Sequence, residues 1–477
     1  MLCTLRLTCI KKQPKALCYV AFAAACSVLV QFYGLSEVLA RLQDSSQALF
    51  HPPSRAYSDD PEIPKWIMDY VEWHKAMRTT FPGEQLFTDP NAPKLVIRTC
   101  PTNVNCGGLN DRLGQLPWDL YIAVQTGRLF LIWWESPKLE DFLQPTEIDW
   151  SVPVQGDKFL KGQPSRRLFD TMKFEWNMKD PDWERRFERA IKRSNIGKTK
   201  GERILTHRLS AHGKGQYFEE KLRALGYGDK IDFTPLFGRT FRLFFRPSPE
   251  VEKNVNFVLS DLGLVPGEFT AVHLRVRYPN AINGSAKNGI DSSGNADLYG
   301  LPWRGSDKES AVSQGVHALR CSQTLLKEPD EKLYLMADSS DLVNYFAVSL
   351  QNSSLSSEVN GGLGLETVQW LKSLNIVARE MSEENLHLDK QSGRNASEYY
   401  ASFVDLLIGS QARCLAYGLG RYGLFAAKLA GTRCQLWYQK ESNATLILGK
   451  GRNVPYCAKI ANGIDILYPT DFKALTD

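Results

Sequence analysis

Several signatures that would assign a function at once are missing from this sequence of 477 residues. It has no G-x-x-x-x-G-K-[ST] loop and no G-x-S-x-G elbow, which counts against P-loop kinases, typical sulfate-donor enzymes and α/β-hydrolases. It has no C-x-x-C pair, so a structural zinc site is not expected. No D-x-D motif stands at a predicted strand end, and the net charge of +5 is mild. We therefore expect neither a metal site nor a nucleic-acid partner.

An N-terminal apolar segment is the clearest targeting feature. Residues 16–35 are almost without interruption apolar, and about 20 such residues are what a bilayer requires. Basic residues precede the segment, so the positive-inside rule predicts a cytoplasmic tail at 1–15, a transmembrane helix at 16–35 and a lumenal remainder. Small residues at 23–26 leave a cleaved signal peptide as the alternative. The polar, proline-bearing residues 36–61 are typical of a stem.

Glycosylation sequons and cysteines support a lumenal body. Four N-x-S/T sequons occur, at Asn283, Asn352, Asn395 and Asn443. Six of the ten cysteines follow the apolar segment: Cys100, Cys106, Cys321, Cys414, Cys434 and Cys457. An even number of cysteines in an oxidising compartment predicts disulfides, whose connectivity the sequence leaves open. Cys100 and Cys106 flank a glycine turn and could close it.

Predicted strands and helices alternate along the rest of the chain. The strands are expected at 94–98, 128–134, 269–275, 332–337, 413–417 and 434–439. The helices are expected at 62–81, 116–126, 250–262, 341–351, 365–382, 397–410 and 422–430. Such alternation predicts an α/β protein with parallel sheets. We expect two Rossmann-like domains facing a cleft, at 62–240 and 241–477, which agrees with the length of the chain.

A glycine-rich turn, Cys106 to Gly114, lies between the first predicted strand and helix. In a βαβ unit the backbone N–H groups at the helix start are exposed, and the macrodipole is positive there. This is a natural seat for a phosphate or another anion. The candidate contacts are Gly107, Gly108, Asn110 and Arg112. A tight turn with no ligand is the alternative.

Two strand ends carry groups suited to a nucleotide. His273, Arg275 and Arg277 alternate onto one face at the end of the strand 269–275, where ligands of open α/β sheets bind. A guanidinium there can grip phosphate with paired donors, although a solvated basic face is equally compatible. At the end of the next strand, Asp338 and Ser339 could contact a ribose or base, or could cap the following helix.

A literal G-x-G-x-x-G occurs at 418–423, after a predicted strand and at the start of a helix. This context suits the cradling of a diphosphate by Gly418 and Gly420. The following strand ends without the acid that a nicotinamide site requires, so an NAD-linked oxidoreductase has only these glycines in its favour. We interpret the motif as a phosphate or sugar contact.

Taken in chain order, these segments resemble the metal-independent inverting fucosyltransferases, which include protein O-fucosyltransferases and α1,6-fucosyltransferases. The similar segments cover roughly residues 94–440. They are Asn110-Asp111-Arg112-Leu113 with TGRLFLIWW, LFFRPSPEV (243–251), VHLR (272–275), MADSS (336–340) and YGLGRYGLFAAKLAG (417–431). The sequence departs from the family pattern at Tyr278, where an acid is frequent, and at Gly418, Gly420 and Arg421, where the family offers serine or threonine.

The resemblance implies a GT-B-like fold with an acceptor-side N-terminal domain and a nucleotide-sugar-side C-terminal domain. It also implies a type II Golgi membrane enzyme that transfers fucose from GDP-fucose to a glycan or protein hydroxyl without a metal. Arg275 would hold the β-phosphate, with Arg421 and the glycine turns nearby. Asp111 stands on the loop that faces the predicted cleft and is therefore the best candidate for the general base, although a helix-capping role is equally compatible. A catalytically inactive module that binds glycans or a partner is the alternative.

Overall fold

The computed structural model describes residues 63–102, 106–114, 116–161, 203–207, 233–275, 308–352, 363–380, 388, 395–418, 420–439, 456–460 and 464–467. All of them belong to one compact unit, Pro52–Asp477. The predicted tail, anchor and stem all lie outside the described residues. Among the helices that are described, none has the length and apolar character needed to cross a membrane.

Helices and strands alternate, as the sequence predicts. The α-helices are α3 (Lys65–Thr80), α4 (Gln85–Thr88), α5 (Leu109–Leu113), α6 (Leu116–Thr126), α7 (Asp157–Leu160), α11 (Phe233–Phe244), α12 (Pro249–Asp261), α13 (Lys308–Gln323), α14 (Ser340–Asn344), α15 (Leu350–Asn352), α16 (Leu365–Ser373), α17 (Tyr400–Gly409) and α18 (Tyr422–Ala430). The other helical turns are η1 (Leu139–Asp141), η2 (Val154–Gly156), η5 (Tyr345–Ser349) and η6 (Ala396–Tyr399). The strands are β1 (Lys94–Cys100), β2 (Arg128–Trp134), β3 (Leu143–Pro145), β4 (Ile204–His207), β5 (Phe245–Pro247), β6 (Thr270–Leu274), β7 (Leu333–Ala337), β8 (Ile376–Val377), β9 (Cys414–Tyr417), β10 (Gln435–Gln439), β11 (Tyr456–Ile460) and β12 (Ile464–Leu467).

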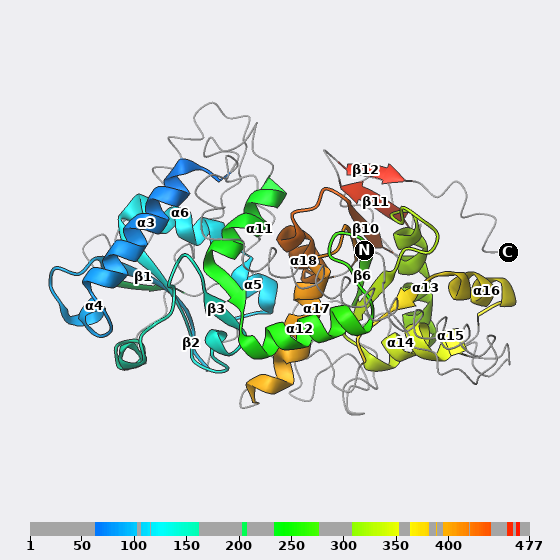
Figure 1. Ribbon diagram of the computed structural model, residues 1–477, viewed down its shortest axis with the longest axis horizontal. Coiled ribbons are helices and arrows are strands. Elements are labelled where there is room, and N and C mark those ends of the chain that lie inside the picture. Colours follow the sequence, from blue (N-terminus) through cyan, green and yellow to red (C-terminus); the bar gives the residue numbers. More distant parts are fainter. Residues whose placement is uncertain are drawn as a thin grey trace, which may run out of the picture. The chain divides into compact units, whose positions relative to one another are not determined.

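The first sheet has the strand order β2-β1-β4, and all its strands are parallel. The predicted βαβ unit is confirmed, since α5 and α6 connect β1 to β2 (Figure 1). All seven residues of β2 are buried. A strand covered on both faces needs apolar side chains in both directions, which explains the continuous run RLFLIWW. A separate antiparallel pair, β3 with β5, completes this part of the chain.

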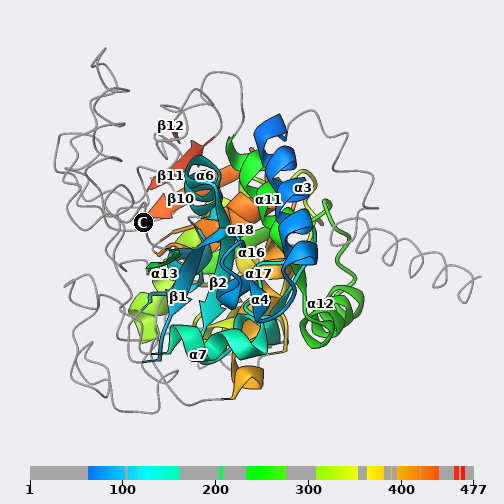
Figure 2. The ribbon, with the colours of Figure 1, turned by 90° about the vertical axis from the view of Figure 1, so that its left-hand side faces the viewer.

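Helix α3 covers the outer edge of β2 and satisfies its backbone (Figure 2). The Tyr70 hydroxyl donates to the carbonyl of Arg128 at 3.0 Å and accepts from the amide of Phe130 at 2.9 Å. One turn on, His74 Nε2 lies 3.1 Å from the Phe130 carbonyl. Unpaired strand edges promote aggregation, so these side chains protect the sheet. Burial lowers the pKa of His74 to about 4.

The lowered pKa of His74 predicts a stability that depends on pH. The unfolded chain takes up a proton near pH 6.5 and the folded chain only near pH 4, so stability is lost as the pH falls between these values. Between pH 7 and pH 5, His74 alone should cost about 2 kcal/mol of unfolding free energy. Urea titrations of the wild type and of His74→Gln check this, because other groups contribute equally to both. Equal losses in the two proteins would contradict it.

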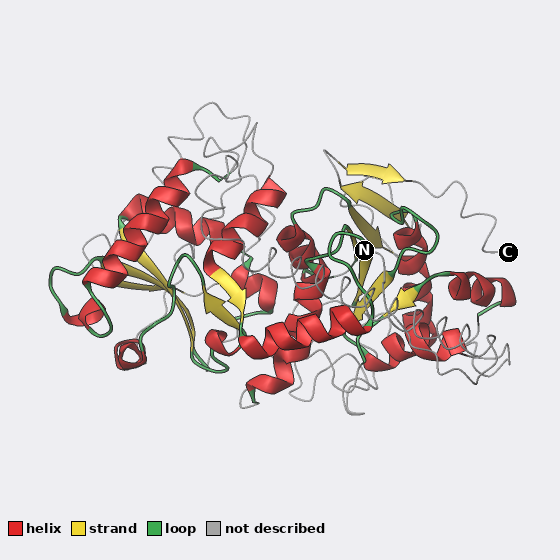
Figure 3. Cartoon of the chain, in the orientation of Figure 1, coloured by secondary structure: helices red, strands yellow, loops and turns green. Residues whose placement is uncertain are grey.

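The second sheet has the order β12-β11-β10-β9-β6-β7-β8 (Figures 1 and 3). Strands β6 to β10 are parallel, and β11 and β12 add to the edge in antiparallel fashion. Counted along the chain from β6, the parallel strands are arranged 3-2-1-4-5, which is the order of doubly wound dinucleotide-binding sheets. Helix α13 packs on the face of Val272 and Leu274, whereas α17 and α18 cover the face of His273. The strand order reverses between β6 and β9.

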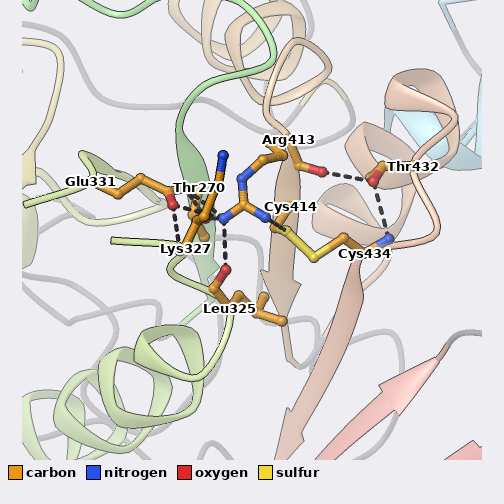
Figure 4. Close-up of polar contacts among 8 residues, drawn as sticks. All are labelled: Thr270, Leu325, Lys327, Glu331, Arg413, Cys414, Thr432 and Cys434. Atoms are coloured by element: carbon orange, nitrogen blue, oxygen red, sulfur yellow. Dashed lines mark hydrogen bonds and ion pairs between the residues drawn. A yellow bond between two sulfur atoms is a disulfide. The ribbon is translucent and has the colours of Figure 1, made fainter. Parts of the chain in front are cut away.

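At the amino ends of the central strands, a partly buried ion pair joins neighbouring elements (Figure 4). Arg413 Nη2 lies 2.7 Å from Glu331 Oε2 and donates to the Leu325 carbonyl at 2.7 Å. The Thr270 hydroxyl at the start of β6 donates to Glu331 Oε1 at 2.7 Å. These groups are engaged with one another and serve the packing of the sheet. The opposite edge, at the carboxyl ends, is where such sheets bind ligands.

The six cysteines after the predicted anchor form three disulfides, as predicted. Cys100 is bonded to Cys106 and thus closes the glycine turn. Cys414 is bonded to Cys434 at the starts of β9 and β10. The third bond, Cys321–Cys457, spans 136 residues and ties β11 to α13. A long closed loop restricts the unfolded chain most, so this bond is expected to contribute the most stability.

The structure differs from the sequence predictions at one helix end, at the last strand and at the domain boundary. The predicted helix 365–382 ends at Ser373, because Leu374 is extended and Ile376 then pairs with Leu333 of β7 as an edge strand. The strand 434–439 is not the last one, since β11 and β12 follow. The predicted domain boundary after residue 240 falls inside α11.

Candidate functional site

The carboxyl ends of β6 and β9 meet where the strand order reverses. Arg275 follows the last residue of β6, and Gly418 follows the last residue of β9. His273 is the register partner of Tyr417, so Arg275 lies beside the turn that contains Gly418 and Gly420. Doubly wound sheets bind their ligands outside the carboxyl ends of strands at this reversal. The topology therefore brings together two segments that the sequence suggested separately as phosphate contacts.

The Arg275 side chain packs directly on Gly420. Gly420 has φ of 87°, a left-handed conformation that favours glycine. A Cβ at this position would lie 2.7 Å from Arg275 Cδ and 2.8 Å from its Nη1, so any larger residue would displace the guanidinium. The main-chain carbonyl of Arg275 accepts from Gln314 Nε2 of α13 at 3.4 Å. Helix α18 begins two residues after Gly420, so its amino-terminal amides face the same turn.

His273 is buried beneath this turn. Its ring centroid lies 5.0 Å from that of Tyr422, and its carbonyl accepts from the Tyr438 hydroxyl at 2.5 Å. Burial lowers the pKa of His273 to about 4; the Asp338 carboxylate opposes this change and the Arg275 guanidinium adds to it. The imidazole is thus neutral near pH 7. Its Nδ1 has no hydrogen-bond partner within the described part of the chain.

The two candidates on β7 have different surroundings. Asp338 follows the last residue of β7, is partly exposed, and is close enough to His273 to raise the pKa of that ring. Ser339 is fully buried, and its hydroxyl accepts from the Leu342 amide at 3.3 Å as the N-cap of α14. Of the two roles predicted for Ser339, a ligand contact and a helix cap, the structure shows the helix cap. Asp338 keeps a position next to Arg275, where it could meet a ligand.

The glycine turn after β1 is held by Asp111. The Gly108 amide donates to Asp111 Oδ2 at 3.2 Å, so the Asp111 side chain caps the start of α5. Gly107 has φ of 79°, and a Cβ there would come within 2.5 Å of Asp111 Cβ. The side chain of Asp111 thus lies over Gly107. The predicted capping role of Asp111 is therefore observed for Oδ2. The other carboxylate oxygen, Oδ1, lies on the side of Arg421.

Arg112 and Asn110 also support this turn. The Arg112 side chain is buried, and its Nε donates to the Gly107 carbonyl at 2.8 Å. Its guanidinium lies 4.8 Å from the Trp134 ring centroid. The Asn110 carbonyl accepts from the Gly114 amide at 2.8 Å. Both residues fix the turn, and a ligand contact of either stays a prediction.

One charged contact links the two glycine turns. Arg421, the N-cap residue of α18, has its Nη1 3.8 Å from Asp111 Oδ1. Their side chains are 34% and 20% exposed, so water reaches both. Helices α5 and α18 are in contact. The predicted anion seat after β1 and the predicted diphosphate turn after β9 therefore lie next to each other.

A buried polar cluster beneath α18 was not predicted. The Asp405 carboxylate on α17 accepts from the Tyr334 hydroxyl at 2.6 Å and from Arg379 Nε at 3.2 Å. Its charge raises the pKa of His273 and of Tyr422, although burial is the larger cause of the shift in each. The cluster supports the residues that form the floor of the site. Only the polar positions within buried helix α17 could have indicated it.

A second unpredicted pair lies under the first glycine turn. Arg98 of β1 and Asp119 of α6 are both buried and form an ion pair. Arg98 Nη1 also donates to the Arg112 carbonyl at 2.8 Å and so supports α5. Burial raises the pKa of Asp119 to about 6, and the adjacent guanidinium opposes this rise. An arginine inside an apolar strand was the only signal in the sequence.

Two remaining predictions concern Arg277 and metals. Arg277 lies outside the described residues. Within those residues, the candidate metal-binding group consists of His317, Cys321 and Cys457, and both cysteines are joined in a disulfide. The two cysteine sulfur atoms form the disulfide between α13 and β11. This group is therefore distinct from the candidate site around Arg275 and Gly420.

No protein-family model matches the chain, and no curated protein matches its sequence. Several solved structures are similar to this chain, at low identity and with TM-scores below 0.5. A mutant of Arabidopsis thaliana FUT1 in complex with GDP has a TM-score of 0.45 and 12% identity, with 83% of each chain covered. NodZ from Bradyrhizobium has a TM-score of 0.36 and 13% identity, covering 73% of this chain and 96% of its own. POFUT1 in complex with GDP has a TM-score of 0.32 and 12% identity, covering 71% and 95%.

NodZ is a fucosyltransferase. The sequence motifs described above resemble the same class of enzyme.

Proposed function

We propose that this protein is a glycosyltransferase that binds a nucleotide-diphosphate sugar at the switch point of its second sheet. The observation that carries the proposal is the placement of Arg275 against the Gly420 turn, with Arg421 and the start of α18 beside it. A diphosphate needs concentrated positive charge and amide donors, and this turn offers both. GDP-fucose is the proposed donor, following the resemblance of the motifs around Arg275 and Asp338.

The proposed reaction is a single displacement. The oxygen of an acceptor hydroxyl on a glycan or protein attacks the anomeric carbon of the sugar, while the bond from that carbon to the β-phosphate oxygen breaks. The electron pair stays on the phosphate, whose growing charge Arg275 stabilises. The hydroxyl proton passes to Asp111 Oδ1. Attack opposite to the leaving group inverts the anomeric centre, and the guanidinium and amide groups neutralise the charge without a divalent ion.

The wider organisation follows from the same proposal. The part of the chain around the first sheet would receive the acceptor, and the part around the second sheet would hold the nucleotide sugar, across a cleft between two GT-B-like domains. An anchor at 16–35 and a stem at 36–61 would place the enzyme in the Golgi lumen as a single-pass type II membrane protein. The sequons and the three disulfides agree with a lumenal location.

One observation favours a second candidate, a module that binds without catalysing transfer. Asp111 Oδ2 accepts from the Gly108 amide, and Oδ1 faces Arg421. A carboxylate engaged in this way can serve the fold alone. The alternative is separated from the enzyme by turnover: such a module would bind a glycan and release no GDP from GDP-fucose.

Calorimetry on the full-length protein in detergent tests the proposal. We expect GDP and GDP-fucose to bind with a micromolar dissociation constant, and we expect UDP to bind more weakly. Slow release of GDP from GDP-fucose should persist in excess EDTA. Absence of guanine-nucleotide binding would overturn the proposal, whereas release that stops in EDTA would overturn only its metal independence.

A further inference from the structure

The contact between Asp111 and Arg421 joins the two glycine turns, but it is a weak one. The 3.8 Å separation between Arg421 Nη1 and Asp111 Oδ1 is too long for a hydrogen bond. Both side chains are partly exposed, so the attraction is screened by water. A paired, hydrogen-bonded contact between a guanidinium and phosphate oxygens is considerably stronger. An incoming diphosphate would therefore displace Asp111 from Arg421.

The other contacts of these residues show what would stay in place. Asp111 Oδ2 is held by the Gly108 amide, and Gly107 leaves room for its Cβ. Arg421 belongs to the N-cap of α18, immediately after Gly420 and thus beside Arg275. The Arg275 side chain packs on Gly420, and the guanidinium of the next residue, Arg421, is paired with the Asp111 carboxylate. Displacement would separate Asp111 Oδ1 from Arg421, while Oδ2 keeps its contact with the Gly108 amide.

We propose that Asp111 occupies the place of the diphosphate on Arg421 in the empty protein, and that donor binding frees this carboxylate to accept the proton of the acceptor hydroxyl. The inference rests on the proposed function and deepens it. Arg421 becomes a specificity-determining contact for the diphosphate, at a position where the resembling family offers a hydroxyl group. The pair couples the two substrates, because the base is available only after the nucleotide sugar has bound.

A double-mutant cycle with GDP as the probe tests this coupling. Dissociation constants are measured by calorimetry on the full-length wild type, Asp111→Asn, Arg421→Gln and the double variant. Asp111→Asn should bind GDP about fivefold more tightly, because the competing charge is lost while the amide oxygen can still accept from Gly108. Arg421→Gln should bind it about tenfold more weakly. The double variant should match Arg421→Gln, since Asp111 competes only through Arg421.

The outcomes separate the two proposals. If the wild type binds no GDP, the proposed function fails, and the coupling fails with it. If GDP binds but Asp111→Asn does not tighten it, or if the two effects add in the double variant, the coupling alone is overturned. Arg433→Gln removes the same charge from an exposed position after α18 and should leave the dissociation constant unchanged. A change there equal to that of Arg421→Gln would reduce the effect to net charge and would also overturn the inference.

Discussion

Replacing Arg275 by alanine is expected to lower the rate constant of sugar transfer by about a thousandfold, because its guanidinium is proposed to stabilise the charge that grows on the β-phosphate. The guanidinium packs on Gly420 at the carboxyl end of β6. Lysine keeps the charge but loses the forked donors, so Arg275→Lys should recover only part of the rate. The measurement is GDP release from GDP-fucose with an acceptor, with kcat and KM determined separately.

Two further variants sharpen this experiment. Gly420→Ala leaves Arg275 in the sequence but places a methyl group where its Cδ and Nη1 lie, so kcat should fall in the same direction. Arg246→Ala removes an exposed arginine from β5 and should have no effect. If Arg275→Ala raises KM while kcat is kept, the residue contributes only to binding, and the proposed mechanism is wrong.

Replacing Asp119 by asparagine is expected to cost about 3–5 kcal/mol of unfolding free energy, because it leaves the buried Arg98 without its counter-charge. Arg98 is 3% exposed and Asp119 is 1% exposed, so water cannot take over the lost partner. The pKa of Asp119 is raised to about 6, so the carboxylate is ionised at pH 7.5 and urea unfolding should be followed there.

The double variant Arg98→Met with Asp119→Leu is the matched control. It removes both charges and keeps side chains of similar size, so it should be less destabilised than Asp119→Asn. The comparison also reports on the site, since Arg98 donates to the Arg112 carbonyl in α5. A single variant as stable as the wild type would show that the pair contributes nothing.

Local patterns in the sequence were enough to predict many single elements. The run 128–134, the helix Leu116–Thr126 and the strand before Arg275 are all observed within one or two residues. Strand order is different, because it depends on hydrogen bonds between segments that are far apart in the chain. Nothing near β6 indicates that its neighbours are β7 and β9. The short edge strand β8 was predicted as helix, since two residues carry too little pattern.

In the candidate site, too, local features were predicted from the sequence, whereas contacts between distant segments were not. Alternation along β6 predicted that Arg275 lies at a strand tip, and the glycine spacing predicted a turn at Gly420. Their direct packing follows from the strand order alone and could not be foreseen. The Asp405 cluster was missed because a buried aspartate in a helix has no signature beyond its neighbours' burial. Ser339 was ambiguous in the sequence, and only the Leu342 amide shows that it caps α14.

The disulfide between Cys321 and Cys457 connects strand β11 to the surroundings of Arg275. Cys457 lies on β11, and Cys321 lies on α13, which also carries Gln314. Gln314 in turn donates to the Arg275 carbonyl. A covalent link thus runs from the antiparallel pair β11 and β12 to helix α13, which holds the main chain of Arg275. Truncation of the chain before Cys457 would therefore loosen Arg275 as well as the edge of the sheet.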